Sequence, residues 1–292
     1  MSSHPITFEQ PPIIIVAAGR SGSKMLRSII GSHPEIAYFP REINYIWRHG
    51  NTIFPTDELR PQHARPAVRN YIRKRFQRFG ASHGDARVLE KTCANSLRVP
   101  FVHAVFPEAY IIHLVRDGRA VAESARRRWL ARPEIKYLLE KARWVPVQDI
   151  PYYGLRYLKF QWRRFGDREK APSSWGPRFA GLDELVQEKS LIEVCGIQWR
   201  TCVEAAENAL TQLPSDQVLT VRYEDLVTDP LDVSAQIFEA IGLDSSPHSQ
   251  TFIREFVTSS NLNKWNKALS QEDMRLLLPH IEATLEKLGY KD

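Results

Sequence analysis

The 292-residue chain is 43% apolar and holds seven tryptophans, enough to bury a substantial core as a single domain over 1–292. Its net charge of +6 and pI near 9.2 favour an anionic partner, although not nucleic acid, because the cations gather in separate short motifs. The three cysteines cannot all pair, so we expect no disulfides. No apolar run approaches the ~20 residues of a membrane span, and the first residues do not have the pattern of a leader peptide. We therefore expect a cytoplasmic protein without membrane spans.

The first predicted elements are a strand over 12–18 and a helix over 23–32. The β-branched run 13–16 is typical of a parallel strand that is covered on both faces. Gly19 and Gly22 let the following backbone turn and approach a ligand at the positive end of the helix. Four donors share this loop, namely Arg20, Ser21, Ser23 and Lys24. The segment predicts an anion-binding loop, although a plain strand-to-helix turn would use the same glycines, and its spacing is not that of a Walker A motif.

The next stretch predicts a short strand, several helices and a second long strand. The ranges are a strand at 36–39, helices within 42–79, a strand at 87–91 and a helix at 95–106. Strands that alternate with helices in this way indicate a three-layer α/β fold.

A second anion motif follows a buried strand predicted at 109–115. Arg116 ends this strand, and Asp117 can cap a helix over 117–130. Arg116, Ser124 and Arg128 could converge on one anion at the carboxyl end of the sheet, where open α/β sheets bind ligands. A solvated basic helix face is the alternative for these arginines.

The rest of the chain predicts a cap and an outer layer of helices. Residues 131–181 are rich in aromatic and basic side chains without strand periodicity, and we interpret them as a helical cap over the acceptor side. A helix at 191–213, a strand at 218–222 and amphipathic helices at 231–241 and 271–288 complete the pattern.

The two motifs resemble those of the sulfotransferases that use 3′-phosphoadenosine 5′-phosphosulfate (PAPS). GRSGSKML, from Gly19, is similar to their 5′-phosphosulfate loop, and VRDGRAVAESARRRW, from Val115, is similar to their 3′-phosphate motif. Further similar pieces are LEKT around Lys91, WGPR at 175–178, VRYEDL at 221–226 and KWNKAL at 264–269. The loop resembles the RSGT of the carbohydrate and tyrosylprotein branches more than the KSGT of the steroid and phenol branch. The resemblance implies a P-loop-like core with a central parallel sheet.

The resemblance also implies roles for three catalytic residues. Glu42 is the expected general base, since the tyrosylprotein branch has its catalytic glutamate in a similar segment. Lys91 matches a lysine of that branch that touches the transferring group, and Arg20 would stabilise the leaving 5′-phosphate together with Lys24. Sulfuryl transfer needs such positioning and charge stabilisation, and in principle no metal.

Alternatives stay open for these residues. Glu42 could form a surface pair with Arg41, and Lys91 could form one with Glu90. A histidine could be the base, as in the steroid-type enzymes, and His33 and His113 are the best placed, although the first could cap a helix and the second could be a core residue.

The expected donor-binding residues come from the loop, the second motif and the tail. The loop residues are Arg20, Ser21, Gly22, Ser23, Lys24 and Met25, and the 3′-phosphate residues are Arg116, Ser124 and Arg128. Tyr223 would face adenine, and Ser259 opens a tail segment that resembles the motif folding over the nucleotide. In this segment Trp265 precedes an asparagine where relatives have a cation, so Lys264 or Lys267 would replace that contact.

Together these features predict a PAPS-dependent sulfotransferase that releases PAP and modifies a hydroxyl or amine. The expected acceptors are, in order, a carbohydrate or glycolipid, a small natural product and a peptide tyrosine. A kinase-like phosphotransferase and a noncatalytic polyanion-binding module remain as alternatives. We expect no nucleic-acid partner, and a homodimer is left open.

Overall fold

The computed structural model describes residues 6, 8–131, 175–258, 262 and 264–290. Within them lies a five-stranded, wholly parallel sheet with the strand order β2-β3-β1-β4-β5. The strands are β1 (Ile13–Val16), β2 (Ile36–Tyr38), β3 (Arg87–Lys91), β4 (Tyr110–Val115) and β5 (Val218–Arg222). The predicted α/β class with a central parallel sheet is therefore confirmed.

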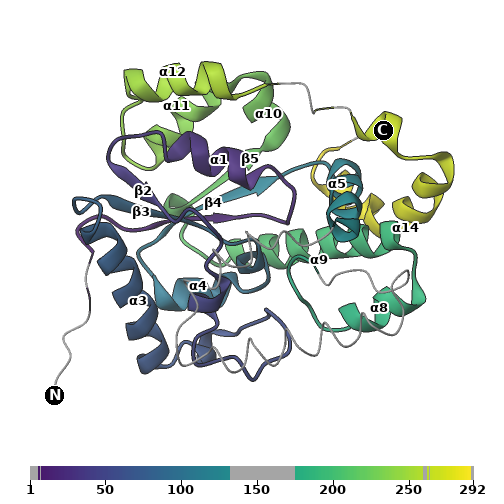
Figure 1. The fold of residues 1–292 in the computed structure, drawn as a ribbon, viewed down its shortest axis with the longest axis horizontal. Coiled ribbons are helices and arrows are strands. Elements are labelled where there is room, and N and C mark those ends of the chain that lie inside the picture. Colours follow the sequence, from purple (N-terminus) through teal and green to yellow (C-terminus); the bar gives the residue numbers. More distant parts are fainter. Residues whose placement is uncertain (1–5, 7, 132–174, 259–261, 263, 291–292) are drawn as a thin grey trace.

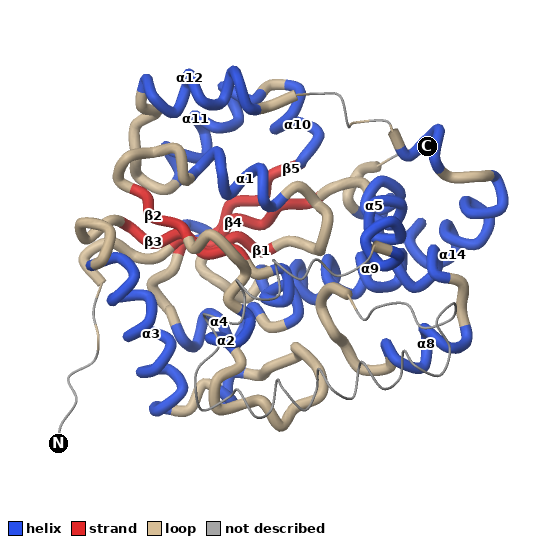
Figure 2. The backbone as a smooth tube through the Cα atoms, in the orientation of Figure 1, coloured by secondary structure: helices blue, strands red, loops and turns tan. Residues whose placement is uncertain are grey.

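Helices cover both faces of the sheet (Figure 1), and the strands lie between them (Figure 2). One face carries α1 (Ser23–Ile30), α10 (Tyr223–Thr228), α11 (Pro230–Ala240) and α12 (Pro247–Phe256). The other carries α2 (Asn44–Trp47), α3 (Pro66–Ala81), α4 (Val99–Val105) and part of α9 (Leu191–Leu210). Beside the sheet, α5 (Gly118–Leu130) and α14 (Gln271–Lys287) pack against α9. The short elements are η1 (Pro61–His63), η2 (Cys93–Leu97), η4 (Ser215–Gln217), α8 (Leu182–Glu188) and α13 (Trp265–Ala268).

The central strand explains why its sequence is apolar without alternation. Ile14 and Val16 belong to the core on the α3 and α4 face, whereas Ile13 and Ile15 belong to the core on the α1 and α11 face. All four side chains are fully buried, because β1 is flanked by strands at both edges and by helices on both faces.

Several predicted boundaries change in the folded protein. The predicted helix at 95–106 is divided into η2 and α4, and Pro100 lies in the first turn of α4, where a proline without an N–H is tolerated. The sequence analysis missed α12, whose Ser246 side chain caps the helix by accepting from the Ser249 N–H. Most of the predicted cap at 131–181 lies outside the described residues. Of the helices in the described ranges, none has the length and apolar character to cross a bilayer.

Candidate active site

The loop between β1 and α1 is held in a strained conformation. Arg20 has a φ of 75° although it carries a side chain, and Gly22 has a φ of 91°. A Cβ atom on Gly22 would lie 2.3 Å from the Tyr223 ring, and one on Gly19 would lie 2.9 Å from the Trp175 ring. The rings of Tyr223 and Trp175 thus pack against the loop, and only glycine fits at Gly22 without a shift of the Tyr223 ring.

This loop has the open donors of an anion site. The Ser21 hydroxyl is buried and, among the described residues, has no hydrogen-bond partner. An unsatisfied buried hydroxyl is costly, and an anion in the loop would satisfy it. Ser23 and Lys24 open α1 and direct their N–H groups outward from its positive end, whereas the Met25 N–H already donates to the Gly22 carbonyl.

The two sequence motifs meet in space. Arg20 Nε donates to Ser124 Oγ at 3.0 Å, and Arg116 Nη1 donates to the Arg20 carbonyl at 3.3 Å. They meet because β1 and β4 are adjacent parallel strands, so the loop after β1 lies beside the turn into α5. Burial lowers the pKa of Arg20, and repulsion from Arg128 and Arg127 lowers it further. Such a concentration of positive charge favours an anion between the motifs.

Two aromatic side chains pack against the second motif. The Arg116 guanidinium lies 4.0 Å from the centre of the Tyr223 ring, and Trp199 Nε1 donates to the Arg116 carbonyl at 3.2 Å. Gly118 is needed here, since a Cβ atom on it would lie 2.7 Å from the Trp199 ring. Tyr223 is buried between Gly22 and Arg116, and its expected contact with adenine stays a prediction.

Glu42 and Lys91 form an ion pair beside the loop. Lys91 Nζ donates to Glu42 Oε1 at 2.5 Å, with the lysine side chain 3% exposed and the glutamate side chain 33% exposed. Burial favours the neutral amine, but the hydrogen-bonded Glu42 carboxylate raises the pKa of Lys91, so the lysine stays charged. The alternative in which Glu42 pairs with Arg41 does not include this ion pair. In place of the alternative surface pair with Glu90, the buried Lys91 is paired with Glu42.

Cys93 connects this pair to the anion loop, which the sequence analysis did not anticipate. Lys91 Nζ lies 3.5 Å from Cys93 Sγ, which lies 3.7 Å from Ser23 Oγ. Burial raises the pKa of Cys93 to about 11, so the group is a neutral thiol. Burial and repulsion from Lys91 also lower the pKa of Lys24, whose side chain shares this region. The only available sequence signal was the position of Cys93 two residues after Lys91.

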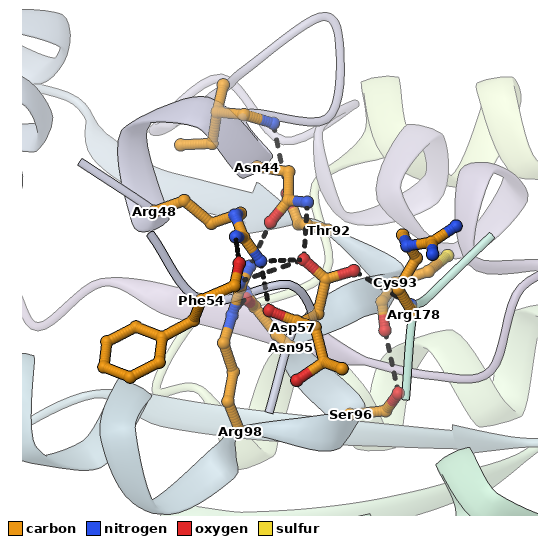
Figure 3. A network of polar contacts seen from close by, with 12 residues as sticks. Asn44, Arg48, Phe54, Asp57, Thr92, Cys93, Asn95, Ser96, Arg98 and Arg178 are labelled. Atoms are coloured by element: carbon orange, nitrogen blue, oxygen red, sulfur yellow. Dashed lines mark hydrogen bonds and ion pairs between the residues drawn. The ribbon is translucent and has the colours of Figure 1, made fainter. Parts of the chain in front are cut away.

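A buried polar network around Asp57 was also missed by the sequence analysis (Figure 3). Asp57 accepts bonds at Oδ1 from Arg48 Nη1 at 3.1 Å and Asn44 Nδ2 at 3.0 Å, and Arg98 Nη1 lies 3.8 Å away. Asp57 Oδ2 accepts from the Arg178 N–H at 2.9 Å. The WGPR segment is thereby fixed, and Gln198 donates to its Trp175 and Pro177 carbonyls.

The two candidate histidines lie outside the Glu42 and Lys91 pair. His33 Nδ1 accepts from the Glu35 N–H at 3.3 Å, and Nε2 lies 3.1 Å from the Asp244 carbonyl. His113 is buried in β4, and burial lowers its pKa to about 4, which makes it a weak base at neutral pH. Which of these side chains acts as the base stays a prediction.

The tail contacts the start of α5. The Arg119 guanidinium, which binds Asp117, lies 4.5 Å from the centre of the Trp265 ring. Lys264 and Lys267 flank this tryptophan and are exposed. Ser259 lies outside the described residues, and its expected role stays a prediction.

Comparisons with known proteins concern the sequence and the fold of this chain. The sequence pattern of the sulfotransferase family matches residues 11–169 and 180–247. Carbohydrate sulfotransferase 2 of Mus musculus is 24% identical over 201 residues, which are 62% of this chain and 34% of the mouse protein. The Homo sapiens protein of the same name matches to the same extent. The chain therefore spans about a third of the length of these curated relatives.

Two solved structures share the fold across nearly the whole chain. The sulfotransferase domain from the curacin biosynthetic pathway has a TM-score of 0.57 at 15% identity, covering 98% of this chain and 99% of that chain. Sulfotransferase STF9 from Mycobacterium avium has a TM-score of 0.58 at 14% identity, covering 97% of this chain and 78% of that chain. Since the family pattern extends over well more than half of the sequence and includes both anion motifs, the chain belongs to the sulfotransferase family.

Proposed function

We propose that the protein transfers a sulfuryl group from PAPS to a hydroxyl or amine acceptor. The observation that carries this proposal is the convergence of two anion motifs on the Arg20 to Ser124 hydrogen bond. PAPS carries one phosphate at the 3′ position and another at the 5′ position of the same ribose. It therefore needs two neighbouring anion sites, and the two motifs lie side by side at one edge of the sheet. Membership of the family favours sulfuryl transfer over a kinase-like reaction or a noncatalytic polyanion-binding role.

The described residues fit this donor. The loop from Arg20 to Met25 would receive the 5′-phosphosulfate through backbone N–H groups and the Ser21 hydroxyl. Arg116, Ser124 and Arg128 would hold the 3′-phosphate. Arg20 would then exchange its bond with Ser124 for one with the donor, because a charged acceptor forms the stronger hydrogen bond.

Glu42 is the proposed base and Lys91 its charged partner. The proton of an acceptor hydroxyl would pass to a Glu42 carboxylate oxygen while the acceptor oxygen bonds to sulfur and the bond from sulfur to the phosphate oxygen breaks. Lys91 and Arg20 would stabilise the negative charge on the transferring group and on the leaving phosphate. Lys24 brings a further cation to the same region.

A carbohydrate or glycolipid is the first acceptor class to test, followed by a small natural product and a peptide tyrosine. The curated relatives carry the name carbohydrate sulfotransferase 2, which supports this order. The sequence argument for this order also rests on aromatic residues. Apart from Trp129 at the end of α5, these belong to the predicted cap at 131–181 and lie outside the described residues.

Calorimetry with PAP and a transfer assay with ³⁵S-labelled PAPS test the proposal together. We expect PAP to bind in EDTA more tightly than ATP does, and label to move to one of the three acceptor classes. Binding of ATP in preference to PAP would support the kinase-like alternative. Salt-sensitive binding of many polyanions without transfer would support the binding module.

A further inference from the structure

The segment that carries Glu42 is tied to the segment that carries Lys91 by one buried hydroxyl. The Ile43 N–H donates to Thr92 Oγ1 at 3.1 Å, and this hydroxyl donates to a Glu90 carboxylate oxygen. Thr92 is completely buried. The bond therefore joins the residue that follows Glu42 to the residue that follows Lys91, although the two lie far apart in the sequence.

The network behind Thr92 returns to the same segment (Figure 3). Glu90 Oε2 accepts from Asn95 Nδ2 at 2.9 Å, and Asn95 Oδ1 accepts from Arg98 Nε at 2.9 Å. Arg98 Nη2 donates to Asn44 Oδ1 at 2.6 Å. Because Asn44 is the neighbour of Ile43, two consecutive residues after Glu42 are both fixed, one through its backbone and one through its side chain.

The direction of each hydrogen bond follows from the groups available. A threonine hydroxyl has one proton, and its donation to Glu90 leaves its lone pairs for the Ile43 N–H. On the other side of Glu42, Arg27 Nη1 donates to the Pro40 carbonyl at 3.0 Å. Glu42 thus lies between two fixed stretches of backbone, and Thr92 makes the direct link to β3.

From this geometry we infer that Thr92 is a positioning residue, which holds Glu42 against Lys91 so that the carboxylate meets the acceptor proton in a productive position. The inference rests on the proposed function, in which Glu42 is the base. A displacement of about 1 Å at a reacting group can lower a rate by about 100-fold, so a bond that fixes the adjacent backbone matters for turnover.

The test compares Thr92→Val, which removes both bonds at nearly constant volume, with Thr92→Ser, which retains the hydroxyl. Both are made with Glu42 intact and in the Glu42→Gln background. Transfer from ³⁵S-labelled PAPS is measured with a hydroxyl acceptor identified in the transfer assay with the three acceptor classes. If no acceptor is found, transfer to water is measured. PAP affinity and thermal unfolding are measured in parallel. Ser96→Ala is the matched control, since this buried hydroxyl lies in η2 and donates to the Cys93 carbonyl.

We expect Thr92→Val to lower kcat by about 10- to 100-fold with PAP affinity unchanged. Thr92→Ser should retain most of the wild-type kcat, and the kcat of Ser96→Ala should stay within about twofold of wild type. In the Glu42→Gln background, Thr92→Val should have little further effect. An equal loss in both backgrounds, or full activity of Thr92→Val, overturns the inference. Full activity of Glu42→Gln instead overturns the proposed base.

If Thr92→Val does not fold, the double variant Thr92→Val with Glu90→Gln replaces it. This variant removes the acceptor for Ile43 without leaving a buried carboxylate that has lost a donor. The same kcat loss and the same dependence on Glu42 are expected, and their absence overturns the inference.

Discussion

Arg20 combines three features at the scale of a single residue. Its backbone has a positive φ, its guanidinium binds Ser124, and its carbonyl accepts from Arg116. Strain of this kind persists only where the surroundings enforce it, and it gathers at functional sites. Arg20 therefore joins the two anion motifs through both its backbone and its side chain.

Loss of the carboxylate at Glu42 should separate rate from binding. Glu42→Gln keeps the size of the side chain and removes the proton acceptor, so we expect turnover to fall by roughly 10² to 10⁴ with PAP affinity unchanged. Single-turnover transfer of ³⁵S and calorimetry measure the two effects. Glu35→Gln, at an exposed glutamate, is the control. Near wild-type turnover in Glu42→Gln, together with its loss in a folded His33→Asn or His113→Asn variant, would identify a histidine base instead.

The second motif should determine donor affinity. Arg116→Ala and Ser124→Ala are each expected to weaken PAP binding by roughly 10- to 100-fold, because hydrogen bonds to charged groups contribute about 1.5 to 3 kcal/mol. Arg275→Ala removes an arginine from an exposed pair on α14 and should leave the affinity unchanged. Wild-type PAP affinity in a folded Arg116→Ala variant would exclude this motif from the donor site.

At the scale of elements, the contact between α9 and α14 includes one carboxylate with several partners. Glu193 near the start of α9 accepts from the Ser190 N–H at 3.0 Å and binds Lys189 at 3.2 Å and His280 of α14 at 3.0 Å. Burial would raise the pKa of Glu193, but the hydrogen bonds from Ser190 and His280 outweigh it and lower the pKa to about 2. The same residue thus caps one helix and connects it to another.

This depressed pKa predicts how the contact responds to acid. Glu193 contributes fully to the free energy of unfolding above about pH 4.5, the ordinary glutamate pKa. This contribution is lost as the pH falls toward about 2. Glu193→Gln should lower the free energy of unfolding by about 1 to 2 kcal/mol at pH 7, and the difference from wild type should narrow below pH 4.5. Urea unfolding across this range measures it, with Glu282→Gln at an exposed position of α14 as the control. A difference that is constant with pH would contradict the assignment.

The elements themselves were largely predictable, whereas their irregular parts were not. The run 13–16 and the strand before Arg116 have a composition that is typical of buried strands, and both form strands of the sheet. The division of 95–106 and the helix α12 depend on local capping and proline positions that apolar periodicity does not report.

At the scale of the whole molecule, Glu90 makes stability depend on pH. It is fully buried, and burial raises its pKa to about 7 although the Thr92 hydroxyl donates to it. Between about pH 4.5 and 7 the folded protein keeps a proton that the unfolded chain has released. Glu90 therefore lowers the free energy of unfolding as the pH rises from about 4.5 to about 7. Above about pH 7 its contribution no longer changes with pH.

Glu90→Gln should remove this dependence. Relative to wild type, the variant is expected to gain about 3 kcal/mol in the free energy of unfolding between pH 4.5 and pH 8, as a shift of this size implies. Urea unfolding at several pH values tests the expectation, and Glu282→Gln on the exposed side of α14 is the control. Parallel stability curves for the variant and wild type would contradict it.

The sequence by itself determined the strand, loop and helix of each anion motif, since glycine positions, β-branched runs and capping residues act over a few neighbouring residues. Only the tertiary structure decided which side chains meet. The strand order β3-β1-β4 brings the ends of three strands together, and so places Arg20 on Ser124 and Lys91 beside Glu42 and Cys93. Hydrogen bonds between residues 49 or 104 positions apart depend on how sheet and helices pack, and no local pattern records that packing.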